Sequence, residues 1–157
     1  MPLESGAVAP DFTLKDQNNQ DVRLSAFRGR KAVLLVFYPL TFTGTCLGEL
    51  TALQTSLDFY DKSGVQVLAV SVDSPYSHKV WAMQEGFTFP LLADFWPHGA
   101  VASSYGVLDQ DRGVAGRGTF VIDPAGVIRF AELAGPGEHR DQARWQHALA
   151  EISGKVG

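Results

Sequence analysis

Hydrophobic and polar residues follow three patterns around the middle of the chain. Residues 32–37 and 65–72 are almost entirely apolar, which is typical of central strands in a sheet that is covered on both faces. Between them, apolar residues recur every three or four positions from Cys46 to Tyr60. This spacing predicts an amphipathic helix that ends near Gly64. The order strand, helix, strand predicts a parallel pair of strands joined by a right-handed crossover.

The rest of the chain gives weaker but consistent signals for short elements, bounded by proline, glycine and polar turns. The predicted elements are a hairpin from 12–14 and 22–24, a helix from Ser74–Pro75 to about Glu85, a short strand within 89–94, a short helix at 101–105, a loop over 109–118, a hairpin from 119–122 and 127–133, and a last helix that presents Trp145, Leu149 and Ile152 on one face.

The composition limits the possible classes of protein. The chain has 157 residues, of which 45% are hydrophobic and 19% charged, and we expect one α/β domain over residues 1–157. The net charge of −4, with scattered basic residues, gives no electrostatic surface for nucleic acid. Because no apolar run approaches the roughly 20 residues of a membrane span and no secretory signal is visible, we expect no membrane partner and a cytoplasmic location.

Cys46 is the only cysteine, and it lies where a buried strand leads into the first turn of the predicted helix. Free backbone N–H groups and the helix dipole at this position stabilise a thiolate, the reactive form of cysteine. The alternative is a small buried hydrophobic residue, but Gly44 and Gly48 favour exposure of the thiol. A lone cysteine excludes an intrachain disulfide, and the four histidines lack metal-ligand spacing, so we expect no metal and no cofactor.

The residues around the cysteine also carry a family resemblance. Pro39, Thr43 and Cys46 form the pattern Pro-x-x-x-Thr-x-x-Cys, and the chain resembles the peroxiredoxin family, AhpC/TSA type, in particular its one-cysteine alkyl hydroperoxide reductase E group. Further matching segments are 9–14, 71–73, 78–81, 89–92, 94–99, 117–120 and 128–132. The resemblance implies a thioredoxin-like fold with an N-terminal hairpin and a central insertion.

It also implies a thiol-dependent peroxidase in which the Cys46 thiolate attacks a hydroperoxide and becomes a sulfenic acid. Thr43 and Arg117 would hold the peroxide oxygens, with Gly44 and Thr45 completing the substrate-binding residues. By its position, the Thr43 hydroxyl is also expected to cap the helix by accepting a bond from the Cys46 N–H.

Two further residues are expected to support the reaction. In the family, the proline that matches Pro39 screens the sulfur from water. Glu49 lies one helical turn after Cys46, where we expect it to orient the arginine through a charge-assisted pair.

The expected partners follow from the absence of a second cysteine. Position 51, where many relatives carry a resolving cysteine, is Thr51, so the sulfenic acid needs an external thiol reductant. The resemblance implies mycothiol with a mycoredoxin-like partner, or another low-molecular-weight thiol. It also implies a homodimer, whose interface we expect to include Phe42, Phe95 and Trp96.

Two other functions compete with the peroxidase. A thiol–disulfide oxidoreductase would need a Cys-x-x-Cys pair, and Glu49 occupies the second position. A peroxide-sensing switch or a holdase chaperone that uses oxidation of Cys46 stays open. The sequence does not distinguish hydrogen peroxide, organic hydroperoxides and peroxynitrite as substrates.

Overall fold

A seven-stranded mixed sheet forms the centre of the molecule. The computed structural model describes residues 1–135 and 137–156, with the backbone alone for 153–156. The order in the sheet is β2-β1-β5-β4-β3-β8-β9, and β6 pairs with β7 outside it. The strands are β1 (Thr13–Lys15), β2 (Asp21–Arg23), β3 (Ala32–Phe37), β4 (Val65–Ser71), β5 (Leu91–Ala93), β6 (Leu108–Asp109), β7 (Val114–Ala115), β8 (Arg117–Ile122) and β9 (Ile128–Ala134).

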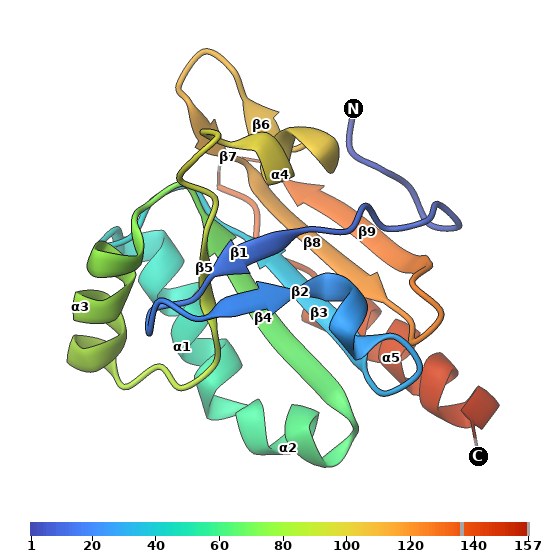
Figure 1. Ribbon diagram of the computed structural model, residues 1–157. Coiled ribbons are helices and arrows are strands. Elements are labelled where there is room, and N and C mark those ends of the chain that lie inside the picture. Colours follow the sequence, from blue (N-terminus) through green and yellow to red (C-terminus); the bar gives the residue numbers. More distant parts are fainter. Residues whose placement is uncertain (136, 157) are drawn as a thin grey trace.

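Helices cover the sheet and connect its strands. They are α1 (Gly44–Thr55), α2 (Leu57–Lys62), α3 (Pro75–Glu85), α4 (Ala100–Ser104) and α5 (Gln142–Val156), with a short 3₁₀ helix, η1 (Leu24–Phe27). Figure 1 shows α4 and the β6–β7 hairpin together at one end of the sheet, and α2 at the opposite end.

The sheet confirms the predicted thioredoxin-like fold. β3 pairs in parallel with β4 and antiparallel with β8, which pairs antiparallel with β9. The β1–β2 hairpin is the predicted N-terminal addition, and β5, α4, β6 and β7 form the insertion in the middle of the chain. β3 lies at the centre because all six of its residues are apolar and buried.

Alternate side chains of β3 point to opposite faces of the sheet, and each face has its own core. Leu34 and Val36 pack with residues of α1, α3 and α5. Leu35 and Phe37 pack with the N-terminal segment and with α4. α1, which carries the only cysteine, is therefore fixed against β3 from one side.

Two predicted elements differ in the structure. The helix expected from Cys46 to about Gly64 is interrupted at Ser56, where α1 ends and α2 begins. The Thr55 hydroxyl donates to the Thr51 carbonyl at 3.0 Å, a back-bond within the helix that favours bending.

The predicted loop over residues 109–118 is also only partly a loop. It contains β7, and its last two residues, Arg117 and Gly118, already belong to β8. Glycines on both sides of Arg117 conceal this strand from propensity arguments.

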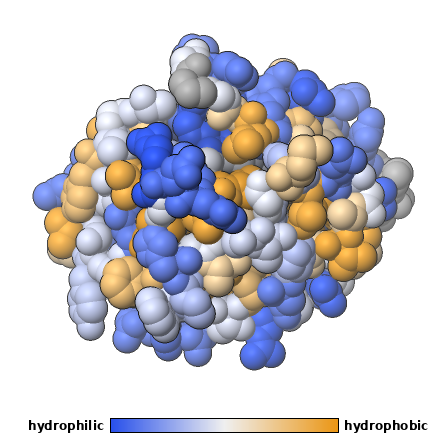
Figure 2. All heavy atoms as spheres, turned by 90° about the horizontal axis from the view of Figure 1, so that it is seen from above, coloured by the Kyte–Doolittle hydropathy of each residue, from blue (hydrophilic) through white to orange (hydrophobic). Residues whose placement is uncertain are grey.

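Several large apolar side chains are exposed, and they include the three aromatic residues expected at a dimer interface. Phe42, Phe95 and Trp96 expose 55%, 52% and 81% of their surface. On the face seen in Figure 2, apolar residues form small areas separated by hydrophilic ones. None of the helices in the described part of the chain has the length and hydrophobicity that crossing a membrane requires.

Candidate active site

The loop from Tyr38 to Thr43 leads from the end of β3 to the start of α1. The Tyr38 N–H still bonds to the Val70 carbonyl of β4 at 3.0 Å, and Pro39, which has no N–H, then ends the pairing. Thr43 occupies the N-cap position of α1, as its spacing predicted. Cys46 is the third residue of the helix, so its thiol lies within the first turn.

The Thr43 hydroxyl does not cap the helix, which contradicts that prediction. It donates to the Leu40 carbonyl at 2.8 Å and makes no capping bond. The hydroxyl turns back because the loop before α1 brings the Leu40 carbonyl within reach. Its lone pairs stay available to accept, and Thr43 is exposed at the helix start.

Cys46 is buried, with only 2% of its surface exposed, so the predicted exposure is wrong. The face of α1 that carries Cys46 also carries Leu50, and both pack in the core on β3. Gly44 and Gly48 lie on another face of the helix, with open space where a Cβ would be. The two glycines therefore leave room beside the helix but do not uncover the sulfur.

Arg117 begins β8 and directs its guanidinium to α1 and to the segment before α5. Nε donates to Glu49 Oε1 at 2.8 Å, Nη1 to the Gly135 carbonyl at 3.0 Å and Nη2 to the Glu138 carbonyl at 2.9 Å. The structure thus contains the predicted Glu49–Arg117 pair. These bonds use three of the five N–H donors of a guanidinium, and the other two have no partner among the described residues.

A second arginine, Arg140, also binds Glu49, and its place in the site was not predicted from the sequence. Its Nε donates to Glu49 Oε2, its Nη1 to the Gly118 carbonyl and Thr119 Oγ1 at 2.9 Å each, and its Nη2 to the Phe37 carbonyl at 2.6 Å. The Arg140 side chain is only 3% exposed. We call Arg117, Glu49 and Arg140 the arginine network.

Arg140 interacts electrostatically with the cysteine. Burial lowers the pKa of Arg140 to about 10, and the negative charge that Cys46 can carry acts in the opposite direction. Arg140 therefore stays cationic at neutral pH. Its sequence neighbourhood gives no sign of this role, because Glu138 and His139 before it are exposed polar residues.

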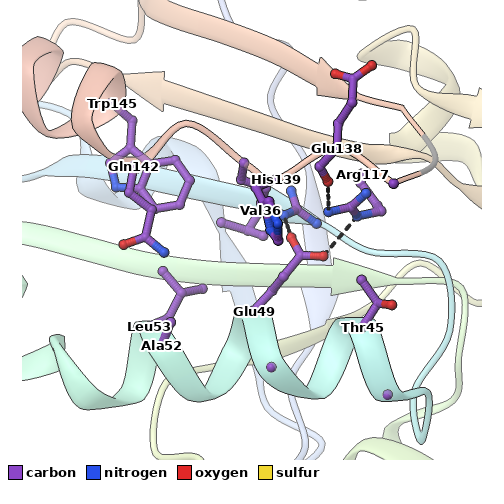
Figure 3. A pocket seen from close by; sticks show the side chains of 14 residues that line it. Val36, Thr45, Glu49, Ala52, Leu53, Arg117, Glu138, His139, Gln142 and Trp145 are labelled. Atoms are coloured by element: carbon purple, nitrogen blue, oxygen red, sulfur yellow. Dashed lines mark hydrogen bonds and ion pairs between the residues drawn. The ribbon is translucent and has the colours of Figure 1, made fainter.

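A cavity of about 520 Å³ lies beside α1, next to the arginine network. Figure 3 shows Thr45, Glu49, Ala52 and Leu53 projecting from α1, with Glu49 directed toward Arg117. The lining residues are Val36, Gly44, Thr45, Gly48, Glu49, Ala52, Leu53, Arg117, Gly137, Glu138, His139, Arg140, Gln142 and Trp145.

The predicted site residues thus fall into two groups. Gly44, Thr45, Glu49 and Arg117 line the cavity, whereas Cys46, Thr43 and Pro39 are not among its lining residues. Neither arginine donates a hydrogen bond to the Cys46 sulfur within the described part of the chain. The two groups meet at the N-terminal turn of α1.

The described residues were also compared with the ligand sets that bind metal ions in proteins. Among residues 1–135 and 137–156, no three histidine, cysteine, aspartate or glutamate side chains lie together as metal ligands would.

Comparisons with known proteins agree with this geometry. Residues 5–131 match the AhpC/TSA family model. The chain is 57% identical over 151 residues to the alkyl hydroperoxide reductase E of Mycobacterium tuberculosis, covering 96% of this chain and 99% of that protein. It is 42% identical over 134 residues to peroxiredoxin-2 of Rattus norvegicus, covering 79% of this chain and 66% of that protein.

Solved structures give the same result. The crystal structure of Enterococcus faecalis AhpC superposes with a TM-score of 0.84 at 32% identity, covering 99% of this chain and 95% of that chain. The reduced 2-Cys peroxiredoxin of Plasmodium vivax superposes with a TM-score of 0.86 at 30% identity, covering 99% of this chain and 84% of that chain. The chain therefore belongs to the AhpC/TSA family, the peroxiredoxins.

Proposed function

We propose that this thiol-dependent peroxidase reduces hydroperoxides at Cys46. The thiolate sulfur attacks the terminal peroxide oxygen, an S–O bond forms and the O–O bond breaks. The leaving oxygen takes a proton and departs as water or an alcohol, while Cys46 is oxidised to sulfenic acid. The observation that carries this proposal is the position of the only cysteine in the first turn of α1, three residues before Glu49, whose carboxylate binds both Arg117 and Arg140.

The arginine network supplies positive charge for this step. Two guanidinium groups share the single carboxylate of Glu49, so the network has a net positive charge. Negative charge moves from sulfur to the peroxide oxygens during the attack, and fixed N–H donors stabilise it there. The two N–H donors of Arg117 that have no partner among the described residues suit the leaving oxygen, and Arg140, held in place by backbone carbonyls, adds a fixed positive charge for the thiolate.

The loop and helix start complete the proposed site. Thr43 orients the peroxide through its hydroxyl, which can exchange its bond to the Leu40 carbonyl for one to the substrate. Gly44 and Thr45, which line the cavity, would contact the bound substrate. Pro39 lies half-buried after β3, where its ring would limit access of water to the sulfur.

The sulfenic acid is proposed to be reduced by a thiol from outside the chain, because Cys46 is the only cysteine. A low-molecular-weight thiol such as mycothiol, with a mycoredoxin-like protein, is the proposed reductant. This choice follows the resemblance of the Pro39–Cys46 motif to the one-cysteine alkyl hydroperoxide reductase E group.

We further propose that the protein is a homodimer of single-domain subunits. Phe42, Phe95 and Trp96 are largely exposed, and aromatic side chains are enriched in protein–protein interfaces. A Trp96→Asp variant should dissociate the dimer. Sedimentation of the native protein as a monomer at micromolar concentration would contradict the proposal.

Stopped-flow tryptophan fluorescence of the reduced protein tests the proposed activity. Mixing with hydrogen peroxide or an organic hydroperoxide should give a second-order rate constant at least 100-fold above that of free cysteine. Cys46→Ser should abolish the signal, and Arg117→Ala should reduce the rate. A sensor would oxidise once without turnover, so peroxide consumption with excess thiol distinguishes it from a peroxidase. A native rate near that of free cysteine, unchanged in Arg117→Ala, would overturn the assignment.

A further inference from the structure

A chain of hydrogen bonds, buried at its His78 end and partly buried at Asp73, runs from α3 to the loop that precedes Cys46. His78 Nε2 lies 2.7 Å from Ser71 Oγ, and Ser71 Oγ lies 2.6 Å from Asp73 Oδ2. The same carboxylate oxygen accepts the backbone N–H of Thr41 at 2.8 Å. We call Asp73, Ser71 and His78 the Asp73 network. It joins residues of β4, α3 and the loop between β3 and α1.

The direction of each bond follows from the chemistry of the groups. A carboxylate can only accept, so the single hydroxyl proton of Ser71 goes to Asp73. The Ser71 oxygen then accepts from His78, which must carry its proton on Nε2. The other nitrogen, Nδ1, is buried and has no hydrogen-bond partner in the described part of the chain. The side-chain donors of His78 and Ser71 therefore both point toward the Asp73 carboxylate, and Ser71 Oγ also accepts the backbone N–H of Asp73 at 3.3 Å.

This arrangement does not belong to a hydrolase, although it contains a serine, a histidine and an aspartate. Ser71 and His78 are fully buried, with no exposed surface, and the serine proton faces the aspartate instead of the histidine. A nucleophilic serine needs the histidine as its base and needs access to a substrate. The network therefore has a task other than attack. It meets the loop at the Thr41 N–H, which Asp73 accepts, and at the Tyr38 ring, whose centroid lies 6.3 Å from that of His78.

The loop that it holds is strained. Phe42 has a φ of 70°, a left-handed conformation that is costly for a residue with a bulky side chain. Such a conformation persists only where the neighbours fix it. Thr41, the residue before it, is fixed on its N–H by Asp73 and on its hydroxyl by the Tyr38 hydroxyl at 3.1 Å. The Phe42 ring packs near Trp81, 6.1 Å between centroids.

We propose that Asp73 is a positioning residue for the peroxide reaction, which it supports by holding the Thr41 N–H and with it the strained loop. Thr41 lies two residues after Pro39 and two before Thr43, so the position of Thr41 affects the positions of both residues. This inference depends on the proposed function of Cys46. Asp73 does not touch the substrate in this account, and its effect reaches the sulfur only through the loop.

The test compares Asp73→Ala with Asp73→Asn and with a matched control at the other end of the molecule. Asp73→Asn keeps an oxygen that accepts from Thr41 and Ser71, whereas Asp73→Ala removes it. Asp123→Ala is the control, because Asp123 likewise accepts backbone N–H bonds, from Ala125 and Val127 at 3.0 Å each, in the β8–β9 turn.

We expect the second-order rate with hydrogen peroxide to fall on the order of 100-fold in Asp73→Ala, and by less than about 10-fold in Asp73→Asn. The Asp123→Ala control should keep the native rate. Alkylation of Cys46 by iodoacetamide requires a thiolate but no alignment of peroxide oxygens, so it should change by less than about 3-fold in all variants. Amide exchange of the 39–45 segment should become faster in Asp73→Ala.

The split between the two reactions decides the inference. If the peroxide rate and the alkylation rate fall equally, Asp73 has only a structural role. An unchanged peroxide rate in a folded Asp73→Ala variant would overturn the inference. If Asp73→Ala does not fold, Ser71→Ala, which removes one of the two donors to the carboxylate, must show the same split at smaller size. A native rate near that of free cysteine would overturn the proposed function, whereas a fast native protein with an indifferent Asp73 overturns this inference alone.

Discussion

The carboxylates of Glu49 and Asp73 both lie around the start of α1, and they have different partners. Glu49 accepts from two guanidinium groups, Arg117 and Arg140. Asp73 accepts from a backbone N–H and a serine hydroxyl, which carry no formal charge. Glu49, three residues after Cys46, holds two cations, and Asp73 holds the backbone N–H of Thr41.

This difference separates two requirements of a reactive thiol. Charge must be present where the transition state develops it, and the groups that bind the peroxide must hold their positions. The arginine network addresses the first requirement and the Asp73 network the second. Substitutions in the arginine network should change both the oxidation rate and the free energy of unfolding. Substitutions in the Asp73 network should change the oxidation rate mainly by moving the groups that bind the peroxide.

The largest effect is expected for Arg140→Met. The change leaves Glu49 with one cation and removes donors from the Gly118 and Phe37 carbonyls, so the free energy of unfolding should fall by about 3 kcal/mol. The rate of Cys46 oxidation should also fall, by about 100-fold or more. Urea unfolding and stopped-flow fluorescence measure the two effects. A loss of stability below about 1 kcal/mol would show that the buried charge is not held by its partners.

Arg117→Ala should separate rate from stability. The Arg117 side chain is 13% exposed and Arg140 remains to neutralise Glu49, so we expect about 1 kcal/mol of lost stability. The oxidation rate should still fall about 100-fold, since the two N–H donors that have no partner in the described part of the chain are lost. Arg117→Lys is the control, because it restores a charge without the fork of donors and should recover only part of the rate. If Arg117→Ala oxidises as fast as the native protein, Arg140 alone supplies the charge.

Much of the fold could be predicted from sequence because its signals are local. The apolar run of β3, the proline at the start of α3 and the turn after β8 each depend on neighbouring residues. The break between α1 and α2 could not be predicted in this way. It involves a side-chain bond to the backbone within a segment whose apolar spacing is continuous.

The site was predictable only where a motif named its residues. Glu49 and Arg117, 68 positions apart, form the pair that the sequence suggested. Arg140 was missed because its partners come from Phe37, Glu49 and residues of β8, which only the folded sheet brings together. The burial of Cys46 was missed because the glycines near it in sequence face away from it in the helix.

The Asp73 network should make stability depend on pH. Burial lowers the pKa of His78 to about 4, and the nearby Asp73 carboxylate acts against this shift. The unfolded chain takes up a proton near pH 6.5 and the folded protein does not, so stability falls as the pH drops from about 6.5 to about 4. Between pH 7 and pH 5 this amounts to about 2 kcal/mol.

A His78→Gln variant isolates that contribution, because glutamine does not titrate and can still donate to Ser71. Urea unfolding at pH 7 and pH 5 should show that the native protein loses about 2 kcal/mol more than the variant. Equal losses in the two proteins would mean that His78 becomes protonated in the folded state.

The smallest effect is expected where the strained loop meets the core. Tyr38→Phe removes the bond between the Tyr38 hydroxyl and Thr41 Oγ1 and leaves the threonine hydroxyl buried without this partner. The free energy of unfolding should fall by about 1 kcal/mol.

The double variant with Thr41→Val removes both polar groups and should recover part of that loss, since neither partner is then left unpaired. Because Asp73 still holds the Thr41 N–H in both variants, the peroxide rate should change by less than about 3-fold. If the peroxide rate of Tyr38→Phe falls as much as is expected for Asp73→Ala, then the tyrosine hydroxyl, and not the Asp73 carboxylate, positions the loop.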